Sequence, residues 1–234
     1  MRYSSNMLLQ ILSLLTACAL GAEPSEKDLR LASTEKLRQL GEAMHLHHDI
    51  FNLLPAQFTK KDDKPLLSWR VELLRGVGEL PLYDKFHHDE PWDSEHNKQF
   101  IAKMPAIFVS PYEKADMVER GLTLYQVPVF KGSLFDEDAP FNYAQIRDGS
   151  SNTIMVVETH PDNAVIWTKP DDWKVDAKDP LKGVVRKKGK GFHALFVDGA
   201  VRLMDDAMDA EKWKLLLGRD DGKNVVPESL ILKE

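Results

Sequence analysis

Residues 87–96 hold the densest group of potential metal ligands in the chain. Imidazole and carboxylate groups together bind zinc and other transition metals, and carboxylates with carbonyl oxygens bind calcium. The candidate ligands are His87, His88, Asp89, Glu90, Asp93 and His96. Pro91 lies among them and excludes a continuous helix, and therefore the H-E-x-x-H geometry of zinc hydrolases. The segment predicts a loop fastened by hydrogen bonds and a helix cap, with a metal-dependent hydrolase that uses zinc or calcium as the alternative.

A second group of residues is a candidate site for a ligand such as a glycan. An exposed tryptophan beside a lysine can stack on a sugar, and a polar segment such as 148–153 can contact it through side-chain oxygens. The residues of this hypothesis are Asp148, Ser150, Asn152, Trp167 and Lys169. A structural role competes, because polar turn residues bond their own backbone and a tryptophan at a strand end is typically buried. The G-x-S-x-G pattern of a nucleophile elbow is absent around Ser150 and Ser151, so no catalytic residue is assigned.

Composition limits the classes of partner. Of 234 residues, 43% are hydrophobic and 29% are charged, which is the balance of a globular protein rather than a disordered one. The net charge of −6 argues against a nucleic-acid partner, which requires a basic face. The single cysteine, Cys18, excludes an internal disulfide and a cysteine zinc site, so stability must come from a buried core.

Residues 1–22 have the pattern of an export signal. Arg2 precedes an apolar run over residues 7–15 that is too short to span a bilayer, and small residues follow it. The sequence LTAC, which ends at Cys18, resembles a bacterial lipobox, in which the cysteine is acylated. Ordinary cleavage among residues 19–22 is the alternative. We therefore expect an exported protein, with a membrane-anchored lipoprotein lipidated at Cys18 favoured over a soluble periplasmic or secreted protein.

The elements that must position the candidate residues begin with helices, within a single domain expected over residues 23–234. Ser25 and Asp28 resemble a capping box, and apolar residues then recur at helical spacing to about residue 53, before Pro55. The polar residues 57–65 predict a loop. Further helical segments are expected from residue 67, over residues 82–86, and from Asp93 or Ser94 to residue 103.

From residue 106 the pattern changes to strands, because β-branched and aromatic runs are bounded by turn residues. The expected strands are residues 106–109, 123–130, 153–158 and 165–168. The clearest feature is a hairpin of residues 192–197 and 200–204, in which Asp198-Gly199 suits a two-residue type I′ turn. A last helix capped by Asp206 or Asp209, and an edge strand at residues 230–232, complete the chain.

Helices followed by antiparallel strands predict an α+β fold. In this fold a long amino-terminal helix and further helices pack on one face of an antiparallel sheet. Strands and helices do not alternate, and neither a G-x-G-x-x-G nor a Walker loop is present, so no nucleotide-binding fold is expected.

Many separated segments also carry a family resemblance. They are residues 37–41, 44–45, 48–49, 54–56, 67–71, 82–83, 88–94, 96–97, 125–127, 146, 148–154, 157–158, 167–170, 191–193 and 196–202. Together they resemble the domain-of-unknown-function family fifteen-fifty-nine, a prepilin-like or pseudopilin-like family that is abundant in planctomycete bacteria. The His-x9-Asp-Gly motif of that family is shorter here, with four residues between His193 and Asp198. The resemblance implies a pilin-like fold and no established activity, and a fold alone does not give a function.

These observations favour a non-enzymatic, envelope-associated protein with a structural or interaction role. Its expected partners are envelope proteins or pilin-like proteins, and the membrane through a lipid anchor. No cofactor and no nucleic acid are expected. A ligand- or glycan-binding module is the first alternative, and the metal-dependent hydrolase is the second.

Overall fold

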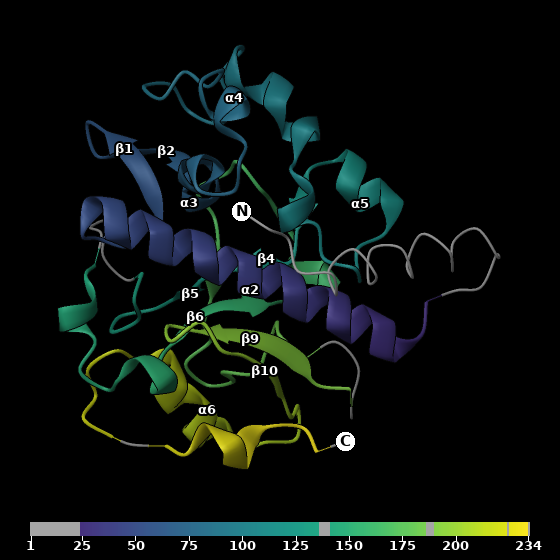
Figure 1. Ribbon diagram of the computed structural model, residues 1–234, viewed down its shortest axis with the longest axis vertical. Helices are drawn as coiled ribbons and strands as arrows, with labels where there is room; N and C mark the ends of the chain where they lie inside the picture. The colour runs from purple at the N-terminus through teal and green to yellow at the C-terminus, as the bar shows by residue number, and fades with distance from the viewer. Residues whose placement is uncertain (1–23, 136–140, 186–189, 224, 234) are drawn as a thin grey trace, which may run out of the picture.

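The computed structural model describes residues 24–135, 141–185, 190–223 and 225–233 (Figure 1). Cys18 and the rest of the expected export signal lie outside these residues. Within the described ranges, no helix combines the length and the apolar character that crossing a membrane requires.

The helices and strands follow one another in an α+β order. The α-helices are α2 (Glu26–Phe51), α3 (Trp69–Glu72), α4 (Leu80–Tyr83), α5 (Ala115–Glu119) and α6 (Ala210–Leu217). The strands are β1 (Phe58–Lys61), β2 (Lys64–Ser68), β3 (Leu122–Thr123), β4 (Tyr125–Gln126), β5 (Pro128–Val129), β6 (Ile154–Glu158), β7 (Val165–Ile166), β8 (Trp173–Lys174), β9 (Phe192–Phe196) and β10 (Val201–Met204). The 3-10 helices are Leu73–Arg75, Asn97–Lys103, Ala106–Phe108, Tyr143–Gln145, Ser150–Asn152, Pro161–Asn163 and Pro227–Leu230.

The long helix α2 confirms the first expected element. The Ser25 hydroxyl accepts a hydrogen bond from the Asp28 amide, and the Asp28 carboxylate accepts one from the Ser25 amide, which completes a capping box. The helix ends where Asn52 adopts the left-handed conformation (φ 57°), a common helix stop. Its buried stripe includes Leu37, Leu40 and Met44, which lie at helical spacing.

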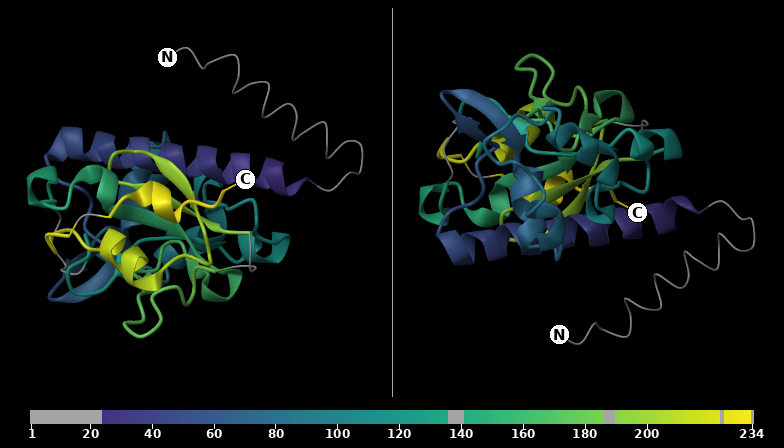
Figure 2. Two further views of the ribbon diagram at one scale, coloured as in Figure 1. Left: turned by 90° about the horizontal axis from the view of Figure 1, so that it is seen from below. Right: turned by 90° about the horizontal axis from the view of Figure 1, so that it is seen from above.

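The central sheet has the order β10-β9-β6-β4, and all of its neighbouring strands are antiparallel. The α+β class is therefore confirmed. One detail of the expectation is wrong, because the helices do not all pack on one face. Leu195 and Met155 belong to the core that includes the buried stripe of α2, whereas Phe192 and Phe196 pack with Trp213 of α6. Figure 2 shows α2 and α6 on opposite sides of the sheet, so both of its faces are covered.

The expected hairpin of β9 and β10 is present, but its turn differs from the predicted one. The Gly199 amide donates to the Phe196 carbonyl, and the Phe196 amide donates to the Ala200 carbonyl. Three residues, 197–199, therefore lie between the hydrogen-bonded residues Phe196 and Ala200, and only Gly199 among them has a positive φ, of 84°. This is the three-residue hairpin with glycine in the left-handed position, not a type I′ turn.

Residues 57–65 form a second hairpin rather than the predicted loop. Strands β1 and β2 pair antiparallel, and Asp62 and Asp63 between them both have positive φ, 52° and 58°. These angles suit a two-residue primed turn, and aspartate tolerates them better than most residues. The predicted helix from residue 67 therefore starts later, at Trp69, with Ser68 as its cap.

Other expected strands are shorter or absent. Residues 106–109 were expected to be extended, but Ala106–Phe108 is a 3-10 helix. The expected strand over residues 123–130 is divided into β3, β4 and β5, which belong to three different sheets. Strand β6 and the last helix α6, capped by Asp209, confirm their predictions. The expected edge strand near residue 231 is reduced to one bridge between Met204 and Ile231.

Candidate functional site

The histidine-rich segment 87–96 is held by hydrogen bonds to its own surroundings. The rings of His87 and His96 stack with centroids 3.4 Å apart, and His96 Nε2 lies 2.8 Å from the Lys85 carbonyl oxygen. His88 Nε2 lies 3.1 Å from the Tyr83 carbonyl oxygen. Glu90 receives hydrogen bonds from Ser94 and His87, which lower its pKa. Throughout the described ranges, no three or more His, Cys, Asp or Glu side chains are grouped so as to hold a metal ion.

Asn97 is the residue that organises this segment, and the sequence did not single it out. Its side chain is fully buried, and its Oδ1 accepts from the His87 amide at 3.0 Å. Its Nδ2 donates to the carbonyls of His87, Glu90 and Pro91 at 2.9–3.2 Å. Asp89 and Asp93 remain outside this network, and Asp89 forms an exposed ion pair with Lys61. The arrangement fixes the loop backbone rather than directing ligand atoms at a common point.

Trp167 and Lys169 do not form the surface that a glycan would stack on. Trp167 is fully buried, its Nε1 donates to the Ile101 carbonyl at 2.8 Å, and its ring stacks on Phe108. The glycan hypothesis, which needs an exposed tryptophan at this position, is therefore contradicted, and the competing expectation of a tryptophan buried at a strand end is confirmed, because burial of the indole is favourable. Lys169 pairs with Asp171 at 3.0 Å.

The segment 148–152 divides into a structural part and an exposed part. The Asp148 carboxylate is buried and accepts from the Asp221 and Gly222 amides at 2.8 and 2.9 Å, and Asn152 Nδ2 donates to the Asp148 carbonyl at 3.3 Å. These contacts fasten the loop to the segment that follows α6. Ser150, by contrast, is exposed and lines a pocket.

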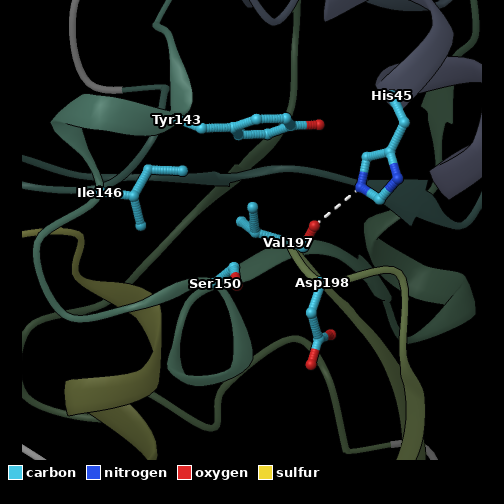
Figure 3. A pocket seen from close by; sticks show the side chains of 6 residues that line it. All are labelled: His45, Tyr143, Ile146, Ser150, Val197 and Asp198. Carbon is cyan, nitrogen blue, oxygen red and sulfur yellow. Dashed lines mark hydrogen bonds between the residues drawn. The ribbon is translucent and has the colours of Figure 1, made fainter.

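This pocket, which we call the His45 pocket, has a volume of about 300 Å³. Its lining residues come from four separate parts of the chain and are His45, Tyr143, Ile146, Ser150, Val197 and Asp198. Figure 3 shows the Tyr143 ring across the pocket from Val197 and Ser150, with Ile146 to one side and His45 to the other. His45 Nε2 lies 2.7 Å from the Val197 carbonyl oxygen, and this contact ties α2 to the β9–β10 turn. Because a carbonyl only accepts, this nitrogen carries the proton.

Tyr143 is the aromatic wall of the His45 pocket. His48 stacks on its ring with centroids 3.8 Å apart, and His45 contacts it edge-on at 5.8 Å. The Tyr143 hydroxyl oxygen is buried and has no hydrogen-bond partner in the part of the chain that the structure describes. Burial and the nearby Asp49 raise its pKa to about 12, so the hydroxyl stays protonated at neutral pH. A buried hydroxyl without a partner is uncommon in native structures, where most such groups are bonded.

A second polar group lies beneath α2 and is closed to solvent. The Glu158 carboxylate is fully buried and accepts from Ser33 at 2.8 Å and from Ser110 at 2.6 Å. His193 Nδ1 lies 2.9 Å from its other oxygen, and the Tyr125 hydroxyl lies 3.2 Å from Ser33. Two serines, a glutamate and a histidine are thus in contact, but the glutamate rather than the histidine is central. Because every member is buried, the group serves the core.

Glu113 borders this buried group. Its Oε1 accepts from the Ser110 and Leu124 amides at 2.9 and 3.0 Å, and its Oε2 is buried without a partner among the residues that are described. Burial is the main cause that raises the pKa of Glu113 to about 8, and the charge of Glu158 adds to it. Lys36 of α2 opposes the shift and hydrogen-bonds the Ala106 carbonyl.

A buried ion pair joins α3 to the segment before β8. Arg70 and Asp172 have fully buried side chains, and their closest atoms are 2.6 Å apart. Arg70 also donates to the Tyr125 carbonyl, and the same Asp172 oxygen accepts from the Val127 amide. Burial raises the pKa of Asp172 in spite of its cationic neighbour. Neither this pair nor Glu158 was identified from the sequence. For Glu158 a signal was present, because a charged residue at the end of the apolar strand β6 indicates a buried polar partner.

Comparison with known proteins gives one match, which is to a family model. Neither the curated proteins nor the solved structures contain a significant match. A family model described as a protein of unknown function (DUF1559) matches residues 30–186. Since these residues make up more than half of the chain, and include most of α2 together with β4 and β6 of the central sheet, the protein belongs to this family.

Proposed function

We propose that this protein is a non-enzymatic, exported protein of the cell envelope that acts by binding other molecules. One observation carries the non-enzymatic part. Several side chains whose types could catalyse a reaction or bind a metal instead hydrogen-bond the main chain. Asp148 accepts from two amides, and His88 and His96 contact main-chain carbonyls. A general base or a metal ligand needs a lone pair directed at substrate or metal.

The envelope part of the proposal rests on residues 1–22. An apolar run followed by LTAC is the pattern of an exported lipoprotein, and an acylated Cys18 would anchor the chain. Other envelope proteins, pilin-like ones among them, are the partners that such an anchor would bring within reach.

The test is the mature amino terminus and its location. The full chain is expressed in a bacterium with an outer membrane, and the product is fractionated and analysed by mass spectrometry. We expect a membrane-bound product that begins at an acylated Cys18. The Cys18→Ser variant is the matched control and should lose the lipid while the fold is retained. A product that keeps Met1 and stays in the cytosol contradicts the proposal.

A metal assay tests the non-enzymatic part separately. Purified protein dialysed against zinc or calcium should retain less than one equivalent per chain. One tightly held equivalent that is lost on substitution of His87 and His96 would instead favour the hydrolase.

A second candidate function is the binding of a small ligand, and the His45 pocket favours it. The pocket combines the aromatic wall of Tyr143 with the exposed Ser150 hydroxyl and the Asp198 carboxylate. Apolar walls with a few convergent polar groups are typical of ligand pockets. A differential-scanning screen of small molecules against the purified protein tests this candidate, because a ligand that binds only the native state raises the melting temperature.

A further inference from the structure

We propose that the His45 pocket binds one neutral sugar ring, either free or as part of a glycan. This inference rests on the second candidate function and names its ligand class. The site differs from the glycan surface expected around Trp167, which is buried, and shares only Ser150 with it.

The walls of the pocket form a slot for a flat, partly apolar ring. Tyr143 lies on one side and Val197 on the other, with Ile146 closing one end (Figure 3). His48 covers one face of Tyr143, with centroids 3.8 Å apart. The pocket lies between the Tyr143 ring and Val197. A volume of about 300 Å³ is at the small end of ligand pockets and suits a single ring rather than an extended molecule. The carbon-bound hydrogens of a sugar face are the groups that pack on such an aromatic wall.

The polar groups of the pocket match the hydroxyls at the edge of a sugar. The Ser150 hydroxyl is exposed and can both donate and accept. The Tyr143 hydroxyl oxygen is closed to solvent, so the ring of Tyr143 is the part available to a ligand. Asp198 is anchored by the Ala200 amide at 2.9 Å, and its other oxygen lies 3.6 Å from Arg202, so a fixed acceptor stands at the pocket wall. The exposed Ser150 hydroxyl can exchange its bond to water for one to a ligand hydroxyl.

The charge and polarity of the pocket favour a neutral sugar over other ligands of similar shape. A phosphate-bearing nucleotide would bring negative charge toward Asp198, in a chain whose net charge is −6. An entirely apolar aromatic ligand would cover the Ser150 hydroxyl without giving it a hydrogen-bond partner. A cation would compete with Arg202, which already lies beside Asp198. A neutral polyhydroxylated ring avoids all three penalties.

The origin of the lining residues supports a built site. His45, Ile146, Ser150, Val197 and Asp198 are up to 153 residues apart in the chain, and the fold brings them together. The contact of His45 with the Val197 carbonyl joins two of these segments directly. Tyr143 supplies the aromatic wall.

The experiment measures sugar binding to protein purified from cells that express the full chain. Glucose, galactose and N-acetylglucosamine are the neutral probes, with glucuronate, glucosamine and adenosine as comparisons, all titrated by calorimetry and by saturation-transfer NMR. We expect at least one neutral sugar to bind with a Kd of about 1 mM or lower, a range accessible to both methods. The charged sugars and adenosine should bind more weakly than that neutral sugar.

Three variants locate the site. Ser150→Ala should weaken binding about 2- to 10-fold, because it removes one hydrogen bond to the ligand. Tyr143→Phe keeps the aromatic wall and removes only a hydroxyl that is closed to solvent, so it should leave the Kd unchanged. Ser151→Ala is the matched control, since Ser151 is the exposed neighbour that does not line the pocket, and it should leave the Kd unchanged. Tyr143→Phe should not lower the melting temperature, because the hydroxyl has no partner to lose within the described chain.

Several results would overturn the proposal. One is that no neutral sugar binds at about 50 mM, far above the expected Kd. Another is that glucuronate or adenosine binds more tightly than every neutral sugar. A third is that Ser150→Ala and Ser151→Ala lose the same affinity for the sugar. Each of these leaves the location and acylation of the protein untouched, so failure of the sugar site and failure of the envelope proposal are distinguishable.

Discussion

Ser33 on α2 and Glu158 at the end of β6 are 125 residues apart in the chain, and their side chains are joined by a hydrogen bond of 2.8 Å in the core. Both are fully buried. The bond fastens the amino-terminal half of the long helix to the central sheet.

Removing this hydroxyl should destabilise the protein. Ser33→Ala leaves Glu158 one donor short in a place that water does not reach, and we expect a loss of about 1–3 kcal/mol in the free energy of unfolding. Urea denaturation followed by circular dichroism measures it. Thr34→Ala on the same turn of α2 should change stability by only about 0.5 kcal/mol. Equal effects of the two substitutions would mean that the bond to Glu158 contributes nothing specific.

Glu113 should make stability fall as the pH rises. Its pKa is about 8 in the folded protein, above the 4.5 of a free glutamate side chain, so the folded state holds its proton to higher pH than the unfolded state. Its contribution is complete below about pH 4.5 and is lost as the pH rises toward 8, at up to about 1.4 kcal/mol per pH unit.

Glu113→Gln isolates this effect from the other titrating groups. The amide oxygen can still accept from the Ser110 and Leu124 amides, and the proton-linked loss disappears. The variant should gain stability relative to the unmodified protein between pH 6 and pH 8.5, as read from urea midpoints. Glu119→Gln, at an exposed position of α5, should show no such gain. A gain that is independent of pH contradicts the assignment.

Asp172→Asn should be severely destabilising. It leaves the buried Arg70 guanidinium without a counter-charge, and breaking such a pair from one side costs about 3–5 kcal/mol. Asp171→Asn breaks the neighbouring pair with Lys169, which is partly exposed, and should cost less than about 1 kcal/mol. Chemical denaturation of both variants at one pH makes the comparison. Similar costs would show that Arg70 finds another partner.

Gly199→Ala tests the turn that carries Asp198. Its φ of 84° disfavours any side chain, and an added Cβ would lie 3.3 Å from His45 Cε1. We expect a loss of about 1–2 kcal/mol in unfolding free energy. Gly78→Ala is the matched control, because it has nearly the same φ, 82°, and open space around it. Thermal denaturation of both variants measures the difference in stability loss. A larger loss in Gly199→Ala than in Gly78→Ala reports crowding against His45, whereas equal losses would mean that the strained backbone accounts for the whole effect.

The sequence predicted the elements whose signals are local. The start of α2 follows from a capping box between Ser25 and Asp28, and the β9–β10 hairpin follows from apolar residues around Asp198-Gly199. The hairpin of β1 and β2 was missed because its turn uses Asp62 and Asp63 in place of the usual glycine. The 3-10 helix Ala106–Phe108 was missed because three apolar residues have no distinguishing period.

The candidate sites were harder to predict from the sequence than the helices and strands, because they depend on tertiary structure. The histidines of residues 87–96 are close in sequence, yet they bond carbonyls such as that of Lys85 instead of a common ion. The His45 pocket joins α2, the 3-10 helix near Tyr143, the Ser150 turn and the β9–β10 turn. No spacing rule relates four such segments, and only Ser150 was among the expected ligand residues.

The length of α2 has a geometric consequence for an anchored protein. His45 lies 19 residues after Glu26 in one unbroken helix, and at 1.5 Å per residue this is a displacement of about 29 Å along the axis. If Cys18 carries the lipid, the helix is a rigid spacer between the attachment point and the His45 pocket. An upright α2 would then present the pocket beyond the headgroup layer, and a helix lying flat would keep it beside the bilayer surface.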